Sequence, residues 1–129
     1  MIFQVLLPMP PSANKMFANV AIRRANANGK LPRGRVKTKA YRDWRKAAVL
    51  TIFAHVRADQ RIGGEVAVTI ELPTSSRIDI DNTVKPILDA LVASNRIDDD
   101  RNVRRLFVWR QRTLADVLVS VESDMGEGR

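Results

Sequence analysis

Cysteine is absent from this chain of 129 residues. That absence excludes disulfides, thiolate metal sites and cysteine nucleophiles, and it fits a protein of the reducing cytoplasm. The start of the chain, Met1–Pro8, lacks the basic residues and long apolar run of a secretory signal. No later segment is long and apolar enough to cross a bilayer. We therefore expect one small cytoplasmic domain that does not contact a membrane.

Histidine is nearly absent as well, because His55 is the single one. It falls within a predicted helix, where a lone histidine is more often structural than catalytic, and we assign it no role. The chemistry of this chain is therefore expected to rest on carboxylates and on lysine or arginine.

Negative charge is scarce: 14 acidic residues face 22 basic ones, which gives a net charge of +8 and a pI of about 10.8. Ten basic residues lie between Arg23 and Lys46, where only Asp43 opposes them. Such a field attracts polyanions. An anionic membrane surface is the alternative, but no predicted helix has the pattern of a lipid-facing one. The charge therefore favours nucleic acid as the partner.

The few acidic residues are unevenly placed, since six of the 14 fall within residues 79–100. They are Asp79, Asp81, Asp89, Asp98, Asp99 and Asp100. Crowded carboxylates repel one another, and this repulsion is usually offset by a bound divalent cation. A basic protein with one acidic pocket suggests an enzyme that binds a phosphate polymer and cuts it.

The first half of the chain predicts strands followed by a helix. Ile2–Leu7 is β-rich and is stopped by the prolines that follow, since proline cannot donate to a ladder. Met16–Arg24 predicts a short second strand, and Asn26–Arg35 has the composition of a loop. Thr38 is the predicted N-cap of a helix over Lys39–Ala58. Its predicted buried stripe consists of Tyr41, Trp44, Ala48, Ile52 and Val56.

The second half predicts a strand, a helix and two closing strands. Alternating apolar residues from Val66 to Leu72 indicate a half-buried strand. A helix over Val84–Val92 must begin near Asn82–Val84, because Pro86 is tolerated only in a first turn. Arg105–Arg112 and Ala115–Ser123 predict two strands, joined as a hairpin around Thr113-Leu114. The order predicts an α+β fold, one sheet with two main helices packed on it.

The spacing of the acidic residues favours a metal site. Asp79 and Asp81 are two apart, so in an extended segment both carboxylates point the same way. Lys85 and Asp89 lie one and two helical turns beyond Asp81, and a short return can bring Asp98–Asp100 beside Asp79. Oxygen ligands of this kind suit magnesium. Lys85 can orient the attacking water or stabilise charge in the transition state.

Each element of this site also has a plain structural explanation. Asp81 can be only an N-cap, worth about 1 kcal/mol. Lys85 with Asp89 can be an ordinary surface pair, worth well under about 1 kcal/mol. Asp98–Asp100 can be a solvated turn. These explanations account for each residue separately but not for their concentration in one short segment of a basic chain.

The chain resembles the RusA family of Holliday junction resolvases in several short motifs that occur in the same order. They are Pro10-Pro11-Ser12-Ala13-Asn14, Tyr41-Arg42-Asp43-Trp44, Arg77-Ile78-Asp79-Ile80-Asp81-Asn82, Lys85, Asp89-Ala90-Leu91 and Asp99-Asp100-Arg101-Asn102-Val103. Each motif is short, but the combination is specific and spans nearly the whole chain.

The resemblance implies a role for each matching residue. Asp79, Asp81 and Asp100 would be the catalytic carboxylates that bind Mg²⁺, for which Mn²⁺ can substitute, and Lys85 would be the catalytic lysine. Asn82 and Asp99 would be accessory residues, Asn82 by supporting the loop. Three consecutive aspartates leave the register open: Val103 favours Asp100 as the third ligand, and Asp99 is the alternative.

The resemblance also implies a homodimer that binds four-way DNA junctions. Two matched nicks across a roughly two-fold substrate require two sites, which a symmetric dimer supplies. Either the apolar helix Val84–Val92 or the first strand is expected to form the contact between subunits. The residues expected to bind DNA are Asn14, Lys15, Arg33, Arg35, Lys37, Lys39, Arg77 and Arg101, with Arg104 and Arg105 nearby.

Taken together, the sequence predicts a magnesium-dependent endodeoxyribonuclease that resolves four-way junctions in recombination and repair. A nuclease of other branched DNA is the alternative within enzymes. A non-catalytic, basic nucleic-acid-binding module is the alternative from another class.

Overall fold

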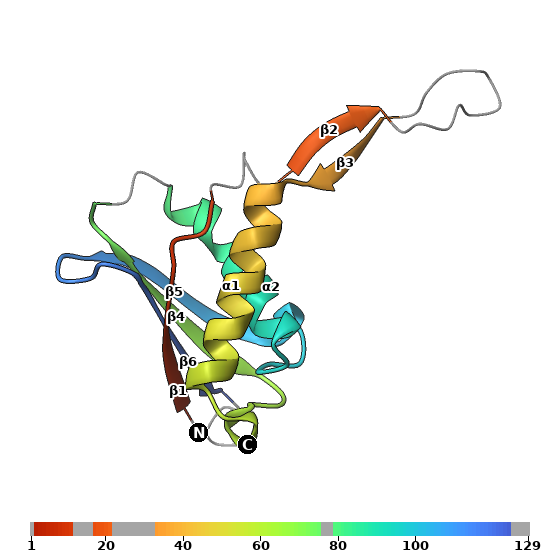
Figure 1. Ribbon diagram of the computed structural model, residues 1–129. Helices are drawn as coiled ribbons and strands as arrows, with labels where there is room; N and C mark the ends of the chain where they lie inside the picture. Colours follow the sequence, from red (N-terminus) through yellow and green to blue (C-terminus); the bar gives the residue numbers. More distant parts are fainter. Residues whose placement is uncertain (1, 12–16, 22–32, 76–78, 125–129) are drawn as a thin grey trace.

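The computed structural model describes residues 2–11, 17–21, 33–75 and 79–124, with the backbone alone described for 17–21 and 33–37 (Figure 1). Its elements, in chain order, are β1 (Ile2–Leu7), β2 (Phe17–Ala21), β3 (Arg33–Lys37), α1 (Lys39–His55), η2 (Ala58–Gln60), β4 (Val66–Pro73), η3 (Ile80–Thr83), α2 (Val84–Ala93), η4 (Asp100–Asn102), β5 (Val103–Gln111) and β6 (Val117–Ser123). The η elements are single turns of 3-10 helix.

Four strands form one mixed sheet in the order β1-β6-β4-β5. β6 runs antiparallel to both β1 and β4, whereas β5 runs parallel to β4. β2 and β3 pair with each other as a separate antiparallel ribbon, which projects from the body beyond the first turn of α1 (Figure 1). The predicted α+β class, one sheet with two main helices, is confirmed.

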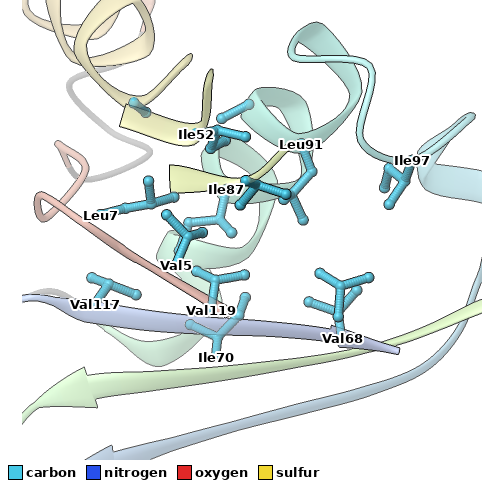
Figure 2. Close-up of a cluster of buried hydrophobic side chains, with 14 of the residues drawn as sticks. Val5, Leu7, Ile52, Val68, Ile70, Ile87, Leu91, Ile97, Val117 and Val119 are labelled. Carbon is cyan, nitrogen blue, oxygen red and sulfur yellow. The ribbon is translucent and has the colours of Figure 1, made fainter. Parts of the chain in front are cut away.

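The core lies between the two helices and one face of the sheet. In Figure 2 side chains of β1, β4 and β6 point toward side chains of α1 and α2. The buried residues of this core include Val5, Leu7, Ile52, Val68, Ile70, Ile87, Leu91, Ile97, Val117 and Val119. Each such side chain contributes about 1.5–3 kcal/mol when fully buried, so this layer carries most of the stability of the fold.

α1 begins where it was predicted to begin. The Thr38 hydroxyl accepts a hydrogen bond from the Tyr41 N–H at 3.2 Å, and all five residues of the predicted stripe are buried. The predicted end at Ala58 is wrong, because Val56 is already extended and the helix stops at His55. The chain then turns through η2, whose Gln60 side chain accepts from the Arg57 N–H at 2.8 Å.

Two other strand predictions need correction. β5 and β6 do not form a hairpin, because β4 lies between them and pairs with both. Residues 112–116 therefore cross the end of β4, and the turn at Arg112-Thr113 does not join two paired strands. The predicted loop Asn26–Arg35 is also partly wrong, since β3 starts at Arg33 and pairs with β2. Residues 22–32 lie outside the described part.

α2 begins at Val84, which confirms the predicted start and places Pro86 in the first turn. It ends through Ser94 and Asn95, and Asn95 takes a positive φ of 58°. The next residue, Arg96, is buried and ties the two helices together. Its guanidinium donates to the carbonyls of Ser94 at 2.9 Å and Val56 at 3.0 Å, so the C-terminal ends of α1 and α2 are held at a fixed separation.

The other face of the sheet is not covered by either helix. β1 and β5 are its edge strands, and four of their large apolar side chains are about half exposed: Ile2, Leu6, Phe107 and Trp109. Among the described residues, no helix is long and apolar enough to span a membrane.

Candidate active site

The first acidic stretch lies in η3, directly before α2. Asp79 precedes the turn in an extended conformation, and the N–H of Asn82 donates to the Asp79 carbonyl at 3.1 Å. Asp81 lies inside the turn, so this segment is coiled and not extended as predicted. The same-side argument from an i, i+2 spacing therefore does not apply to Asp79 and Asp81, although both carboxylates are exposed.

The second acidic stretch lies beyond the other end of α2, and its three aspartates have different surroundings. Asp98 accepts from the Arg61 guanidinium and, at 3.0 Å, from the Gly64 N–H, so it fastens the loop at residues 61–64. Asp99 caps η4 by accepting from the Arg101 N–H at 2.9 Å. Asp100 is the first residue of η4, is exposed, and lines a pocket.

Asp99 is held in its charged form. The backbone N–H of Arg101, then the Arg101 guanidinium, then the neighbouring Asp100 carboxyl lower the pKa of Asp99 to about 2. Its two oxygens are therefore engaged with Arg101, at 2.9 and 3.1 Å. The choice of Asp100 over Asp99 as the third ligand, which Val103 favoured in the sequence, stays a prediction.

A pocket of about 440 Å³ brings part of the predicted site together. Its lining consists of Arg45, Lys85, Asp89, Val92, Ala93, Asp99 and Asp100. These residues come from α1, from one side of α2 and from the start of η4, and α2 packs against both other elements. The lining therefore combines two cations with three carboxylates, a set of groups that suits a metal-neutralised phosphate.

Lys85 and Asp89 are neighbours on α2, and both line this pocket. The Lys85 Nζ lies 3.7 Å from Asp89 Oδ2, one helical turn along α2. The same oxygen accepts a hydrogen bond from the Tyr41 hydroxyl at 3.0 Å. Burial, followed by this hydrogen bond to Asp89, raises the pKa of Tyr41 to about 12, so the tyrosine remains a neutral donor.

Asp79 and Asp81 do not line this pocket. Within residues 2–11, 38–75 and 79–124, whose side chains are described, no three histidine, aspartate or glutamate side chains lie close enough to hold a metal ion. The structure thus places Lys85, Asp99 and Asp100 in one pocket, which Asp79 and Asp81 do not line.

Arg45 and Asp89 line the pocket but were not predicted as site residues, and neither was Tyr41, whose hydroxyl contacts Asp89. Arg45 lies off the buried stripe of α1, and that position was a signal that it faces solvent or a ligand. Tyr41 is the single tyrosine and falls in the buried stripe, where a hydroxyl needs a partner. That partner, Asp89, is 48 residues away, so spacing alone could not identify it.

The predicted DNA-binding residues are only partly described. Lys39 is paired with Asp43 at 2.6 Å, and Arg101 is paired with Asp99. Arg33, Arg35 and Lys37 lie on β3, where the backbone is described; Asn14, Lys15 and Arg77 lie outside the described residues.

Two further arginines are held by acidic partners. Arg104 pairs with Glu65 at 3.3 Å, and Arg105 makes two hydrogen bonds to Asp124, at 2.8 and 3.0 Å. The outer face of α1 adds a basic groove, lined by Arg42, Arg45, Lys46, Val49 and Leu50, which shares Arg45 with the pocket.

Comparison with known protein families identifies the family of this chain. Residues 8–122 match the family model described as Endodeoxyribonuclease RusA. The matched region contains the whole pocket, both acidic stretches and all elements from α1 to β5. A search of the curated proteins gives no match.

Proposed function

Since this chain belongs to the RusA endodeoxyribonuclease family, we propose that it is a magnesium-dependent resolvase that cuts four-way DNA junctions by paired, symmetric nicks. We place this activity in recombination and repair, in the cytoplasm. The observation that supports the proposal most directly is the pocket that is lined by Lys85 together with the carboxylates of Asp89, Asp99 and Asp100. A lysine beside acidic residues, in a protein of net charge +8, suits hydrolysis of a phosphodiester.

We propose Asp79, Asp81 and Asp100 as the ligands of Mg²⁺, for which Mn²⁺ can substitute. Their carboxylate oxygens are the donors that magnesium prefers, so the chemistry of the set fits the ion. The described chain does not gather three of them, and we therefore derive no coordination geometry. When bound, the ion would neutralise charge on the phosphate and lower the pKa of a water molecule.

The protein residues of the pocket have roles of their own in this proposal. The Lys85 ammonium stabilises negative charge that develops on the phosphate, because it is exposed and lines the same pocket as Asp99 and Asp100. Arg45 attracts the backbone of the substrate into the same pocket. Asp99 acts indirectly, by capping η4 and thereby holding Asp100 in place.

Cleavage of synthetic substrates tests the proposed function. Purified protein with Mg²⁺ is expected to cut a mobile four-way junction at two symmetric positions on opposing strands, read on a denaturing gel. Mn²⁺ should support cutting, and chelation should abolish it, because the carboxylates cannot activate water alone. Preferential cutting of forks or flaps would indicate the branched-DNA alternative. No metal-dependent cutting of any substrate would indicate a non-catalytic module.

We propose a homodimer as the form that cuts. Of the two segments expected to form the contact, α2 packs Ile87, Ala90 and Leu91 into the core of its own chain. β1 leaves Ile2 and Leu6 exposed. Light scattering is expected to give a mass of about 29 kDa, twice the 14.5 kDa of one chain. A mass of one chain at micromolar concentration, with full cutting activity, would contradict the dimer.

A further inference from the structure

Asp89 connects the protein core to the lysine of the pocket. The side chain of Asp89 is 25 % exposed, whereas that of Lys85 is 63 % exposed. One oxygen of Asp89, Oδ2, is 3.0 Å from the buried Tyr41 hydroxyl and 3.7 Å from Lys85 Nζ. The Asp89 carboxylate therefore contacts a fixed partner, Tyr41, on the side of the core and a mobile partner, Lys85, on the side of the solvent.

The support behind Asp89 is rigid. Tyr41 is fully buried and stacks on Trp44, with ring centroids 6.4 Å apart and an angle of 15° between the planes. The Trp44 indole N–H in turn donates to the Pro8 carbonyl at 2.8 Å, which anchors α1 to the segment after β1. A tyrosine held in this way has few alternative rotamers, so its hydroxyl fixes the position of the Asp89 carboxylate.

Surface lysine–aspartate pairs differ from this arrangement. Lys39 and Asp43 show the ordinary case: they have the same i, i+4 spacing on α1, but their side chains are 83 % and 62 % exposed. Both partners of such a pair are mobile, and the interaction contributes little. In the Lys85–Asp89 pair one partner is fixed, so the aspartate limits where the long lysine chain can place its charge.

We propose that Asp89, oriented by Tyr41, is the positioning residue for Lys85. It keeps the ammonium on the pocket side of α2, beside Asp99 and Asp100, where a phosphate is attacked. This inference rests on the proposed function of the pocket. It assigns to Asp89 a role through Lys85 and not a direct contact with the reacting atoms.

The substitution Asp89→Asn removes the negative charge of the side chain but keeps its size and shape. The amide oxygen of asparagine can still accept from the Tyr41 hydroxyl, but the negative charge that holds Lys85 is lost. We expect the single-turnover rate of junction cleavage to fall about 10- to 100-fold, with unchanged junction affinity and melting temperature. Tyr41→Phe should lower the rate about 3- to 10-fold. Asp59→Asn, which removes an exposed partner of Arg57, is the matched control and should cut like wild type.

A double variant decides whether Asp89 acts through Lys85. If it does, Asp89→Asn causes no further loss in a Lys85→Ala background, because both changes remove the same interaction. An equal additional loss in that background would overturn the inference, since Asp89 would then act independently, for instance as an oxygen ligand. A wild-type rate for Asp89→Asn beside a defective Lys85→Ala would also overturn it, while the proposed function would stand.

Chemical labelling gives a readout that does not depend on cleavage. Acetic anhydride is applied to metal-free, DNA-free protein, and acetylation of Lys85 is compared by mass spectrometry with that of Lys39. Loss of the fixed carboxylate in Asp89→Asn should leave the Lys85 ammonium unpaired and more accessible, so its relative labelling should rise about 2- to 5-fold. Unchanged labelling would mean that Asp89 does not hold the lysine. Wild-type protein that cuts no branched DNA would overturn the proposed function, and the labelling would still decide the contact.

Discussion

Asp100→Asn is expected to lower the rate of junction cleavage by about 10³-fold or more while leaving junction binding intact or tighter. Asp100 is exposed, lines the pocket that contains Lys85, and is the proposed third ligand of the ion. The amide keeps the size of the side chain but loses the charge that attracts a cation. It also removes repulsion toward the phosphate backbone, which is why binding should not weaken. Asp79→Asn and Asp81→Asn are expected to behave alike.

The adjacent Asp98 provides a matched control for this experiment. Its carboxylate accepts from the Gly64 N–H and the Arg61 guanidinium and does not line the pocket. Asp98→Asn can retain one of these bonds, so its cleavage rate should stay within a few-fold of wild type even if its melting temperature falls slightly. Normal cutting by Asp100→Asn, or an equal loss in both variants, would show that Asp100 is not the functional carboxylate.

The affinity for junction DNA is expected to fall by about 10³-fold between 50 and 200 mM salt. This estimate assumes about six phosphate contacts, each of which releases a counterion. The basic groove on α1 offers three cations for such contacts, Arg42, Arg45 and Lys46, and the net charge of +8 indicates that others are available elsewhere in the chain. Fluorescence anisotropy of a labelled junction, measured in chelator so that no cutting occurs, gives the slope of affinity against salt.

Two variants test whether the dependence of affinity on salt arises from the basic groove on α1. Arg45→Ala combined with Lys46→Ala removes two cations of the α1 groove and should reduce the slope by about two. Arg57→Ala is the control, because Arg57 is paired with Asp59 beyond the other end of α1 and should leave the slope unchanged. A slope near zero for the wild-type protein would contradict a binding mode based on phosphate contacts.

Local patterns in the sequence were sufficient to predict the elements that have one buried face. The stripe of α1, its N-cap at Thr38 and the start of α2 at Val84 all follow from periodicity and from the chemistry of capping and proline. The partners of β5 could not be predicted in the same way. Its outer positions carry Phe107 and Trp109 on an edge strand, so the segment lacks the alternation that marks a buried face.

The candidate site, like the fold, could be predicted from the sequence only in part. The sequence pointed to the acidic residues and to Lys85, because their concentration in a basic chain is visible without a structure. It could not distinguish three consecutive aspartates, since the distinction depends on the partners Gly64, Arg61 and Arg101. The contact between Tyr41 and Asp89 joins two helices and depends on how they pack, which no local pattern specifies.

The β2–β3 ribbon has an energetic consequence for the way this protein meets DNA. Two paired strands that project from the body have few contacts to stabilise them, and such hairpins are marginal in water by themselves (Figure 1). Opening the ribbon therefore requires far less free energy than unfolding β4, which is hydrogen-bonded on both sides. A phosphate backbone bound along the ribbon would supply the missing stabilisation. Substitutions in the β2–β3 ribbon would change the residence time of the protein on DNA, while its heat resistance stayed the same. The ribbon and the body of the protein can therefore vary independently.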